Sequence, residues 1–484
     1  MNLFHEVDHA LMHFNLEFSQ GFSLAWAANA EAGERVINRA VGLTEKMFSV
    51  PAEKPVVRVI QIHGDVPAGV FIGHDFSGKS CNKTVPLFSA GFIAELSRHS
   101  FAQLRLLRDL NSFHDSIKSP VGWRQKQKSP LESLSPLGDD DQMKAVQLMS
   151  HGTPGQFEPR EIPEPLPSER EVVVRVGACG VNRLDLWAEE GALPVKLELP
   201  RILGCEIAGE ILALGRDVST WQVGDRVAVQ SNLSCGACEF CARGRESICV
   251  KGLILGVNRD GGFAEQVLVP ETSLVALPDS VSFETSAALT LAGTTAMHML
   301  TSRTNVRSGD WVLVIGGASG VGSAAIQIAK ALGAYVIATG STEAKRVFGK
   351  KLGADHVVDS NLDTWPAEVR RITGKRGVDL VVEHVGGNVL LQAMESLARG
   401  GTIVTCGATA GRDVQIKLWS LFVKEQSIVG SYGRNRTDFE TTLQWVEQGR
   451  LKPVIDEIYP LADTAKALAR LRARTVMGKL VVSP

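Results

Sequence analysis

Residues 311–332 read WVLVIGGASGVGSAAIQIAKAL. An apolar run, Trp311–Ile315, leads through a glycine-rich turn into a helical stretch, Ser323–Leu332. Glycines let such a turn approach a pyrophosphate, whose charge then lies against the free N–H groups of the helix start. The order G-x-x-G-x-G departs from the common G-x-G-x-x-G, and an ordinary βα turn is the alternative, but the strand-turn-helix context favours a dinucleotide site. The predicted cofactor-binding residues here are Gly317, Ser319, Gly320, Val321 and Gly322.

Short apolar runs alternate with helical stretches on the C-terminal side of this turn. The candidate strands are Trp311–Ile315, Tyr335–Thr339, His356–Val358, Leu380–Glu383, Thr402–Thr405 and Ser427–Val429. Gly333, Gly353 and Gly400 stand where the intervening helices should end. Strands joined by crossover helices predict a doubly wound parallel sheet, so the fold class is α/β.

The end of the second strand should select the cofactor. An Asp or Glu there would bind the ribose 2′-hydroxyl of NAD, but this chain has Gly340, followed by Ser341. Lys345 and Arg346 come within a helical turn, and such small and basic groups suit a 2′-phosphate. We therefore expect Ser341, Lys345 and Arg346 to bind NADPH. Glu343 keeps NADH possible, and a solvated helix face is the alternative for the two cations.

Four cysteines crowd one short segment in the spacing C-x2-C-x2-C-x7-C. They are Cys235, Cys238, Cys241 and Cys249. Four thiolates can close a tetrahedral shell around one zinc ion, which leaves no position for water or substrate. Disulfides between residues this close would strain the chain and suit secreted proteins instead. The spacing thus predicts one structural zinc.

Composition excludes several classes of protein. The chain has 484 residues, which suffices for about three domains, and its formal net charge is −2. This charge gives no electrostatic reason to expect nucleic acid or an anionic membrane as a partner. No apolar run reaches the ~20 residues that cross a bilayer, and the first residues lack the pattern of a signal peptide. We expect a cytoplasmic protein with a small-molecule substrate.

Residues 1–142 give few signals and their fold is unknown from sequence. Val56–Ile62 could form a strand, and residues 116–142 have the Pro/Ser/charge composition of a linker. Gly73-x4-Gly78-Lys79-Ser80 has the spacing of a phosphate-binding P-loop. Pro86 would break the helix that must follow, so we interpret this match as chance. An alternative for the whole segment is an extension upstream of the true start.

From Met143 to Pro484 the chain resembles the medium-chain dehydrogenase/reductase superfamily of zinc alcohol dehydrogenases and quinone reductases. The resemblance rests on Ala178–Asp185, Gly204–Gly209, Val223–Val227, the four-cysteine lobe and the glycine turn. It implies a GroES-like, mostly β catalytic domain at 143–285 and a Rossmann domain at 286–430. Residues 431–484 would return to the catalytic domain. The resemblance also implies a homodimer or homotetramer.

One family feature is missing. Zinc-dependent members hold a catalytic metal with a cysteine, a histidine and usually a second cysteine, and the matching positions are Asn182, Cys205 and Leu291. Asn and Leu do not supply thiolates, so we expect no catalytic zinc. A rebuilt metal site is the alternative. Its candidate ligands are Cys179, Cys205, Asp185 and Glu206.

The resemblance also implies substrate and nicotinamide contacts. Asn182-x2-Asp185-x-Trp187 is similar to the Asn-x2-Asp-x-Tyr stretch of zinc-free quinone reductases. Asn182 would offer an amide donor, while Trp187 could line the pocket but lacks a phenol. Thr295 matches the threonine that touches the nicotinamide. Val385 and Gly407 would line the cofactor cleft; we expect His384 to be a core histidine within a strand.

Together these residues predict an NADPH-dependent oxidoreductase that transfers hydride to a quinone, enone or related conjugated carbonyl. Such an acceptor spreads the resulting charge onto a distant oxygen, so hydrogen-bond donors can replace a metal. Two alternatives remain: a zinc-dependent alcohol or aldehyde dehydrogenase with unusual ligands, and a non-catalytic NADPH-binding protein, for example one that contacts RNA.

Overall fold

The computed structural model describes residues 73–74, 80–81 and 142–484. Contacts divide the chain into two units, Met1–Lys128 and Ser129–Pro484; of the described elements, β1 (Gly73–His74) and β2 (Ser80–Cys81) lie in the first and the others in the second. The predicted strand at Val56–Ile62 lies outside the described residues, as does most of the linker at 116–142. Within the P-loop match, β1 pairs antiparallel with β2. Ser80 is thus in a strand pair, whereas a P-loop needs it in the first turn of a helix.

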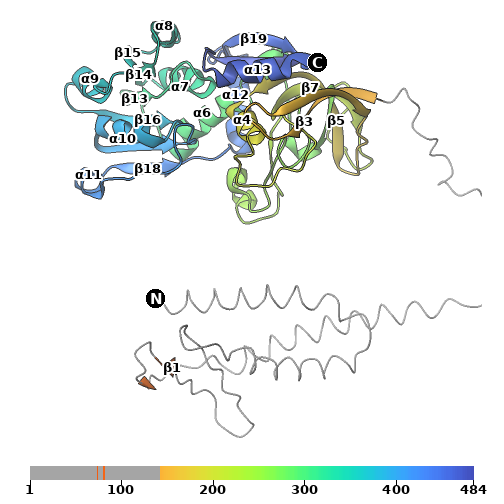
Figure 1. Cartoon of the computed structure of the whole chain (residues 1–484), viewed down its shortest axis with the longest axis horizontal. Helices are drawn as coiled ribbons and strands as arrows, with labels where there is room; N and C mark the ends of the chain where they lie inside the picture. Colours follow the sequence, from red (N-terminus) through yellow and green to blue (C-terminus); the bar gives the residue numbers. More distant parts are fainter. Residues whose placement is uncertain (1–72, 75–79, 82–141) are drawn as a thin grey trace, which may run out of the picture. The chain divides into compact units, whose positions relative to one another are not determined.

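The Rossmann domain contains a six-stranded, wholly parallel sheet (Figure 1). Its strands are β13 (Trp311–Val314), β14 (Tyr335–Gly340), β15 (His356–Asp359), β16 (Val378–Glu383), β17 (Leu397–Thr405) and β18 (Ser427–Gly430). Their spatial order is β15-β14-β13-β16-β17-β18, the doubly wound arrangement. This confirms the predicted fold class, and the order reverses between β13 and β16, where such sheets bind their ligands.

Helices cover both faces of this sheet. They are α7 (Gly320–Ala331), α8 (Glu343–Lys351), α9 (Trp365–Ile372), α10 (Gly387–Ser396) and α11 (Leu418–Val423). Successive strand residues point to opposite faces, so Val312 and Val314 of β13 pack in the cluster that contains Ile328 of α7. Leu313 packs on the other face with Trp365 of α9.

The predicted helix ends are right at two positions and wrong at the third. Gly333 and Gly353 follow the last residues of α7 and α8 with φ of 87° and 106°, a conformation that favours glycine. Gly400 instead lies inside β17, because α10 ends earlier, at Ser396.

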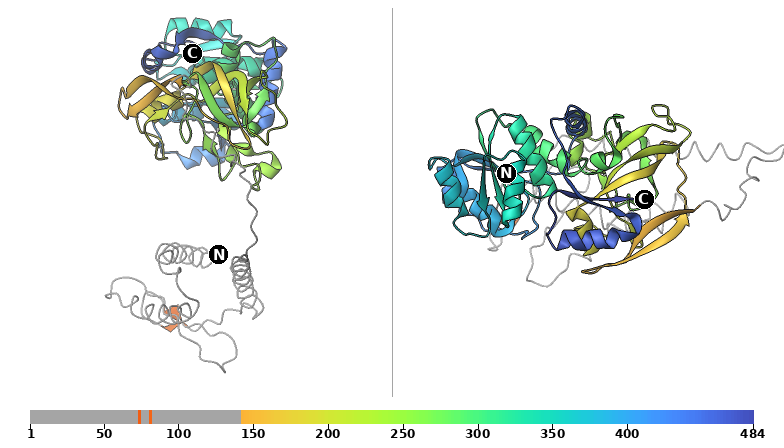
Figure 2. Two further views of the ribbon diagram at one scale, coloured as in Figure 1. Left: turned by 90° about the vertical axis from the view of Figure 1, so that its right-hand side faces the viewer. Right: turned by 90° about the horizontal axis from the view of Figure 1, so that it is seen from above.

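The remaining strands form the mostly β domain (Figure 2). A seven-stranded sheet follows the order β12-β8-β7-β5-β20-β19, and β11 also pairs with β5. Its members are β5 (Glu171–Val181), β7 (Glu206–Leu214), β8 (Arg226–Val229), β11 (Gln266–Pro270), β12 (Leu274–Ala276), β19 (Ile455–Pro460) and β20 (Lys479–Ser483). A smaller sheet holds β3 (Gln142–Ser150), β4 (Gln156–Pro163) and β6 (Arg201–Ile202). Since β19 and β20 come from the C-terminal end of the chain, residues distant in sequence meet in this sheet.

Helices join the two domains. The helices outside the Rossmann sheet's cover are α4 (Arg183–Glu189), α5 (Phe283–Ala287), α6 (Ala292–Met297), α12 (Arg436–Glu447) and α13 (Thr464–Arg472). Phe439 of α12 packs with β-domain residues, and Trp445, nearly two turns later, packs in the Rossmann cluster. α12 therefore helps to fix one domain against the other.

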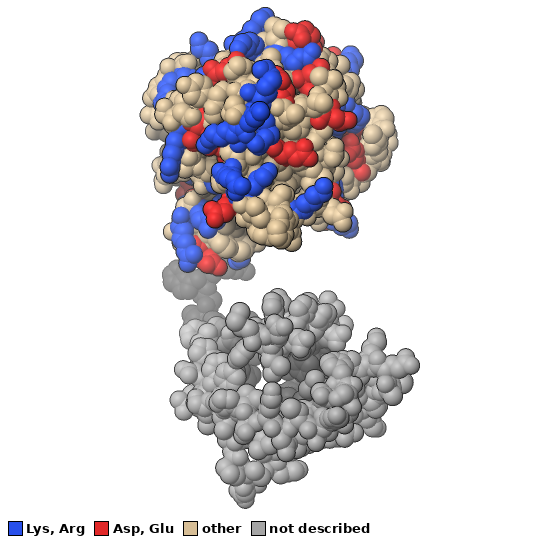
Figure 3. All heavy atoms as spheres, turned by 90° about the vertical axis from the view of Figure 1, so that its left-hand side faces the viewer, with Lys and Arg blue, Asp and Glu red and all other residues tan. Residues whose placement is uncertain are grey.

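Two surface properties bear on function. Among the described residues, no helix combines the length and apolar character that a membrane span requires. Lys and Arg are interspersed with Asp and Glu on the face shown in Figure 3.

Candidate active site and zinc lobe

The glycine turn after β13 is tightly packed and held by hydrogen bonds. The N–H of Gly316 donates to Thr339 Oγ1 at 2.9 Å, and the N–H of Gly317 donates to the Thr339 carbonyl at 3.0 Å. Ser319 caps α7, its Oγ accepting from Gly322 N at 2.9 Å. A Cβ on Gly322 would lie 2.3 Å from the Gly316 carbonyl oxygen, so the turn requires glycine. The residues present thus fit the pyrophosphate of a dinucleotide.

The predicted cofactor-selecting residues lie at the end of β14. Arg346 forms ion pairs with Asp359 at 2.8 Å and Glu343 at 2.9 Å, and its side chain packs over Gly340. Lys345 Nζ donates to the carbonyl of Arg474 at 2.7 Å. Both cations therefore have protein partners. Glu343, the residue that kept NADH possible, pairs with Arg346, but its side chain is 77% exposed.

A buried carboxylate, Glu206, lies among Asn182, Leu291 and Lys479 and accepts hydrogen bonds from all of them. Glu206 is 0% exposed. Its Oε1 accepts from the backbone N–H of Leu291 at 2.6 Å and of Ala292 at 3.0 Å. Its Oε2 accepts from Asn182 Nδ2 at 2.9 Å and forms a 2.7 Å ion pair with Lys479 Nζ. Every position of this carboxylate is thus occupied by a protein donor.

Lys479 supplies the positive charge of this network. The side chain is 5% exposed, and its Nζ also donates to Asn182 Oδ1 and to the Val181 carbonyl, both at 2.7 Å. The lysine stem passes over the start of α7, because a Cβ on Gly320 would lie 2.7 Å from Lys479 Cδ. An ammonium group therefore sits among the residues that match the catalytic-metal ligands.

Asn182 differs from its expected role. Its two amide hydrogens go to the Gly180 carbonyl at 3.0 Å and to Glu206, while its oxygen accepts from Lys479. In this arrangement no amide hydrogen is left for a substrate carbonyl. Asn182 holds the Glu206–Lys479 pair in place instead.

The other candidate ligands of a rebuilt metal site, Cys179, Cys205 and Asp185, are buried. Cys179 and Cys205 are buried free thiols whose pKa burial raises well above its ordinary value, so they stay protonated. Asp185 accepts from the backbone N–H groups of Asn182 at 2.7 Å and Gly204 at 3.2 Å. Burial raises the pKa of Asp185 to about 7. Within the described residues, these side chains form no cluster with metal-binding geometry.

The four-cysteine segment does form such a cluster. The four Sγ atoms, from Cys235, Cys238, Cys241 and Cys249, lie within 4.8 Å of one another. The segment is folded by two 3-10 turns, Cys241–Arg243 and Glu246–Ile248, and by the pairing of β9 (Asn232–Leu233) with β10 (Leu253–Ile254). Backbone N–H groups of Cys241 and Val250 lower the pKa of Cys238 to about 6, whereas burial and the neighbouring thiols raise that of Cys241 to about 12, so the cluster does not hold four thiolates without a cation. The predicted ligand set therefore fits one tetrahedral zinc.

A cleft of about 1030 Å³ lies between this lobe and the Rossmann domain. Trp187 and Gly407 line it, as predicted, together with His298, Ser302 and Tyr432. Thr295 lies in α6, one turn before His298, and is 9% exposed. Val385 follows β16 directly, beside the cleft residue Gly386.

The prediction for His384 is half right. Its Nε2 lies 2.9 Å from the Ile315 carbonyl, as expected for a satisfied internal histidine. It does not lie within a strand, however, because β16 ends at Glu383. Glu383 accepts from the N–H groups of Val385 and Gly386, both at 2.6 Å, and so turns the chain out of the sheet.

Sequence reasoning missed Lys479 and His298 altogether. Lys479 is separated from Asn182 by 297 positions and His298 from Asp438 by 140, so no local pattern brings either pair to attention. A weak signal was present for Lys479, since a lysine at the edge of the apolar run Leu480–Val482 is unusual in a buried strand.

Comparison with known proteins agrees with this architecture. The family model described as "Alcohol dehydrogenase GroES-like domain" matches residues 168–279, and that described as "Zinc-binding dehydrogenase" matches residues 320–448. An alcohol dehydrogenase of Geobacillus stearothermophilus is 34% identical over 70% of this chain and 99% of its own length. An acryloyl-coenzyme A reductase of Metallosphaera sedula is 31% identical over 70% of this chain and 100% of its own.

A solved structure shows the same fold. The crystal structure of an NAD-dependent alcohol dehydrogenase, 40% identical, superposes with a TM-score of 0.69 over 71% of this chain and 100% of that one. With two family models and full-length relatives in agreement, the chain belongs to the medium-chain dehydrogenase/reductase superfamily and is an NAD(P)-dependent oxidoreductase.

Proposed function

We propose that this protein reduces a conjugated carbonyl with NADPH, using one structural zinc and no catalytic zinc. The observation that carries the proposal is the Glu206–Asn182–Lys479 network. Its ammonium and amide groups bind the Glu206 carboxylate, so this carboxylate has protein partners in place of a metal ion. Oxidation of a simple alcohol needs help in removing a proton of high pKa, which zinc gives as a Lewis acid. Reduction of a conjugated acceptor does not.

The roles of the chain's own residues follow from their positions. The turn Gly317–Gly322 would hold the pyrophosphate, and Thr295, Val385 and Gly407 would position the nicotinamide, which supplies the hydride when the cofactor is bound. Trp187 would exclude water from one side of the cleft. Ser341, Lys345 and Arg346 would contact the 2′-phosphate. That contact requires Lys345 to leave the Arg474 carbonyl.

The charge of the cleft favours an anionic substrate. Arg245, Arg303 and Arg412 line it, and none of the described lining residues is Asp or Glu. Arg303 and Arg412 bond to backbone carbonyls and form no ion pair with a carboxylate. α,β-Unsaturated acyl-coenzyme A thioesters combine phosphates with a conjugated carbonyl, and one relative is named as an acryloyl-coenzyme A reductase. We therefore place conjugated thioesters beside quinones and enones as candidate substrates.

The first alternative is an alcohol dehydrogenase with unusual ligands, which the names of several relatives favour. It requires a second zinc ion near Cys205 and Glu206. The second alternative, a non-catalytic NADPH-binding protein, predicts tight cofactor binding without turnover.

One set of measurements separates the proposed reductase from the two alternatives. Zinc per chain is measured by mass spectrometry, NADPH and NADH affinities by titration, and turnover with a neutral quinone, a neutral enone, crotonyl-coenzyme A and a primary alcohol. We expect one zinc, tighter binding of NADPH, and turnover of the conjugated acceptors, with the thioester preferred.

Variants assign the zinc to its site. Cys238→Ala should remove the zinc, whereas Cys205→Ala, a matched change at a buried thiol, should leave one zinc per chain. A second zinc that disappears in Cys205→Ala, together with alcohol oxidation, would replace the proposal by the first alternative. Binding of NADPH with no turnover of any acceptor would replace it by the second.

A further inference from the structure

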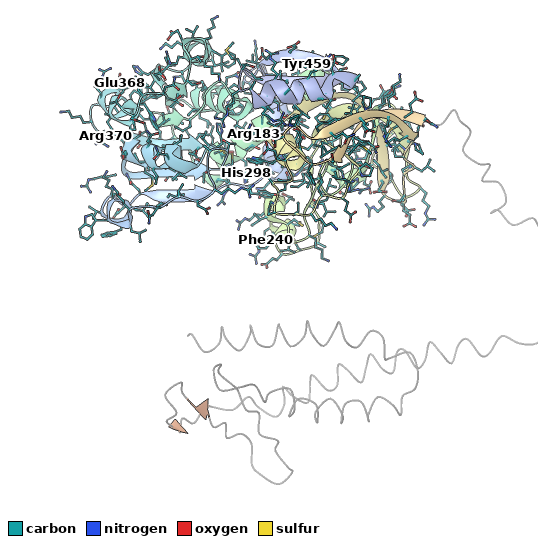
Figure 4. The ribbon with its side chains drawn as sticks, in the orientation of Figure 1. Arg183, Phe240, His298, Glu368, Arg370 and Tyr459 are labelled. Carbon is teal, nitrogen blue, oxygen red and sulfur yellow. The ribbon has the colours of Figure 1, made fainter. Side chains whose placement is uncertain are left out.

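A histidine–carboxylate pair lies in the cleft and has no part in the function proposed so far. His298 Nδ1 lies 2.7 Å from Asp438 Oδ2, and both side chains are buried, at 2% and 3% exposure. Within the described residues, the other ring nitrogen, Nε2, has no protein hydrogen-bond partner, although His298 lines the cleft. Figure 4 shows His298 where the two domains meet, on the side of the lobe marked by Phe240.

Asp438 is fixed as a permanent negative charge. Its Oδ1 accepts from Ser302 Oγ at 2.5 Å, and its Oδ2 also accepts from the N–H of Asn435 at 2.8 Å. Burial raises the pKa of Asp438, but the hydrogen bonds from His298 and Ser302 outweigh it, so this pKa lies below its ordinary value. A carboxylate held in this way fixes the orientation of the imidazole ring.

The backbone at His298 is unusual as well. The helix that begins at Ala292 continues from His298 to Arg303 as a π-helix, a form that is rare and frequent at functional sites. His298 follows Thr295 by three positions, so both residues project from the same side of the helix. The charged groups that line the cleft around His298 are Arg303 on the same segment, Arg245 on the zinc lobe and Arg412 after β17.

We propose that His298 is the proton donor of the reductase, with Asp438 as its positioning residue. The inference rests on the proposed reduction of a conjugated carbonyl. Hydride from the bound cofactor forms a new C–H bond at the β carbon, and the π electrons of the C=C bond move toward the carbonyl as an enolate. The Nε2–H bond of the imidazolium then breaks, and its proton bonds to the α carbon with the enolate electron pair. Water at the cleft mouth returns a proton to Nε2.

The competing explanation is structural: the pair would only tie the π-helix to α12. A rate loss on mutation does not separate these explanations. The configuration of the α carbon does, because a fixed donor delivers its proton to one face, whereas solvent water reaches both. We therefore choose a substrate that records which face was protonated.

The experiment reduces an α-methyl enone with NADPH in D2O and determines the configuration at the α carbon. His298→Asn is the test variant, because an asparagine amide can still donate to Asp438 but has no acidic proton at the Nε2 position. His356→Asn, at a histidine on the exposed edge of β15, is the matched control. Zinc content and NADPH affinity are measured for each, so that folding is followed separately from chemistry.

For wild type and His356→Asn we expect one configuration in large excess. His298→Asn should turn over about 10²-fold to 10⁴-fold more slowly, the range for loss of a general acid, with a nearly racemic α carbon. Asp438→Asn loses the fixed charge, so its rate and its excess of one configuration should lie between those of wild type and His298→Asn. If His298→Asn fails to bind zinc and NADPH, His298→Gln is used in the same assay.

Three outcomes would overturn one of two claims, the inference about His298 or the proposed function. A His298→Asn or His298→Gln enzyme that keeps both the wild-type rate and the wild-type product configuration would overturn the inference alone. A variant that is slow but still stereospecific would assign the pair a structural role, which also overturns it. Wild-type protein with no activity on any conjugated acceptor would instead overturn the proposed function.

Discussion

At the scale of single residues, Lys479 supplies the positive charge that pairs with the buried Glu206. Its ammonium group neutralises Glu206, which is 0% exposed and has no contact with solvent. A buried ion pair of this kind often adds little net stability, but removing one partner leaves an unpaired buried charge. The main effect of removing the lysine is therefore that the buried Glu206 carboxylate loses its partner.

We predict that Lys479→Met destabilises the protein strongly, by about 3–5 kcal/mol, the usual cost of breaking a buried pair from one side. The double variant Lys479→Met/Glu206→Gln should recover a large part of this loss, because it removes the unpaired charge. Lys466→Met, at an exposed lysine paired with Asp463, is the control and should cost less than about 1 kcal/mol. Unfolding by denaturant measures all three. Equal losses in the single and double variants would contradict the prediction.

Asp185 gives a second residue-scale prediction, for pH. Burial is the largest cause that raises its folded-state pKa to about 7 from the ordinary value of 3.8. The folded protein thus binds more protons than the unfolded chain between these two values, so stability should fall as pH rises through this window. Asp185→Asn should lack this dependence. Thermal midpoints of both proteins from pH 4 to pH 8 test it; parallel curves would refute the raised pKa.

At the scale of elements, the turn between β13 and α7 packs closely because it has glycines where side chains would clash. Gly322 lies in the first turn of α7, where its missing side chain lets the helix start approach the Gly316 carbonyl. Gly349 of α8 offers a contrast, because a Cβ there would lie 3.5 Å from its nearest neighbour, an ordinary contact. The same chemical change should therefore have opposite effects in the two helices.

We predict that Gly322→Ala weakens NADPH binding at least tenfold, since its Cβ would lie 2.3 Å from a carbonyl oxygen and the turn must open. Gly349→Ala should leave NADPH binding unchanged and stabilise the protein by up to about 1 kcal/mol, the helix-propensity difference between the residues. Titration with NADPH and denaturant unfolding provide the measurements. Unimpaired binding by Gly322→Ala would mean that the cofactor does not use this turn.

At the scale of the whole molecule, one edge strand of the Rossmann sheet is available for pairing with a second subunit. β18 is the last strand in the sheet order, and α11 beside it carries exposed Leu418, Trp419 and Phe422. Trp419 is 74% exposed and lies edge-on against Phe422, with 5.0 Å between the ring centroids. Clustered exposed apolar side chains mark interaction sites, and an unpaired edge strand is a template for a second copy of itself.

We predict a homodimer or homotetramer whose subunits meet at α11 and β18. Replacing Trp419 and Phe422 together by Glu should shift the protein to monomers, because charge would be buried in the interface. Lys351→Glu, a charge change at an exposed position at the end of α8, away from α11, is the control and should leave the assembly intact. Sedimentation or light scattering measures the mass. An unchanged mass in the double variant would place the interface elsewhere.

Sequence alone determined what depends on neighbours in the chain. The six strands, the glycine turn and the four-cysteine lobe follow from local periodicity, backbone freedom and ligand spacing, and the structure has each where the pattern indicated. The roles of side chains in the pocket did not follow in this way. The tertiary structure placed Lys479 beside Asn182 and Glu206, turned the amide of Asn182 inward, and brought His298 to Asp438. Lys479 and Asn182 are 297 positions apart and meet because β20 pairs with β5 in one sheet. His298 and Asp438 are 140 positions apart and meet where α12 packs against the segment that begins with α6.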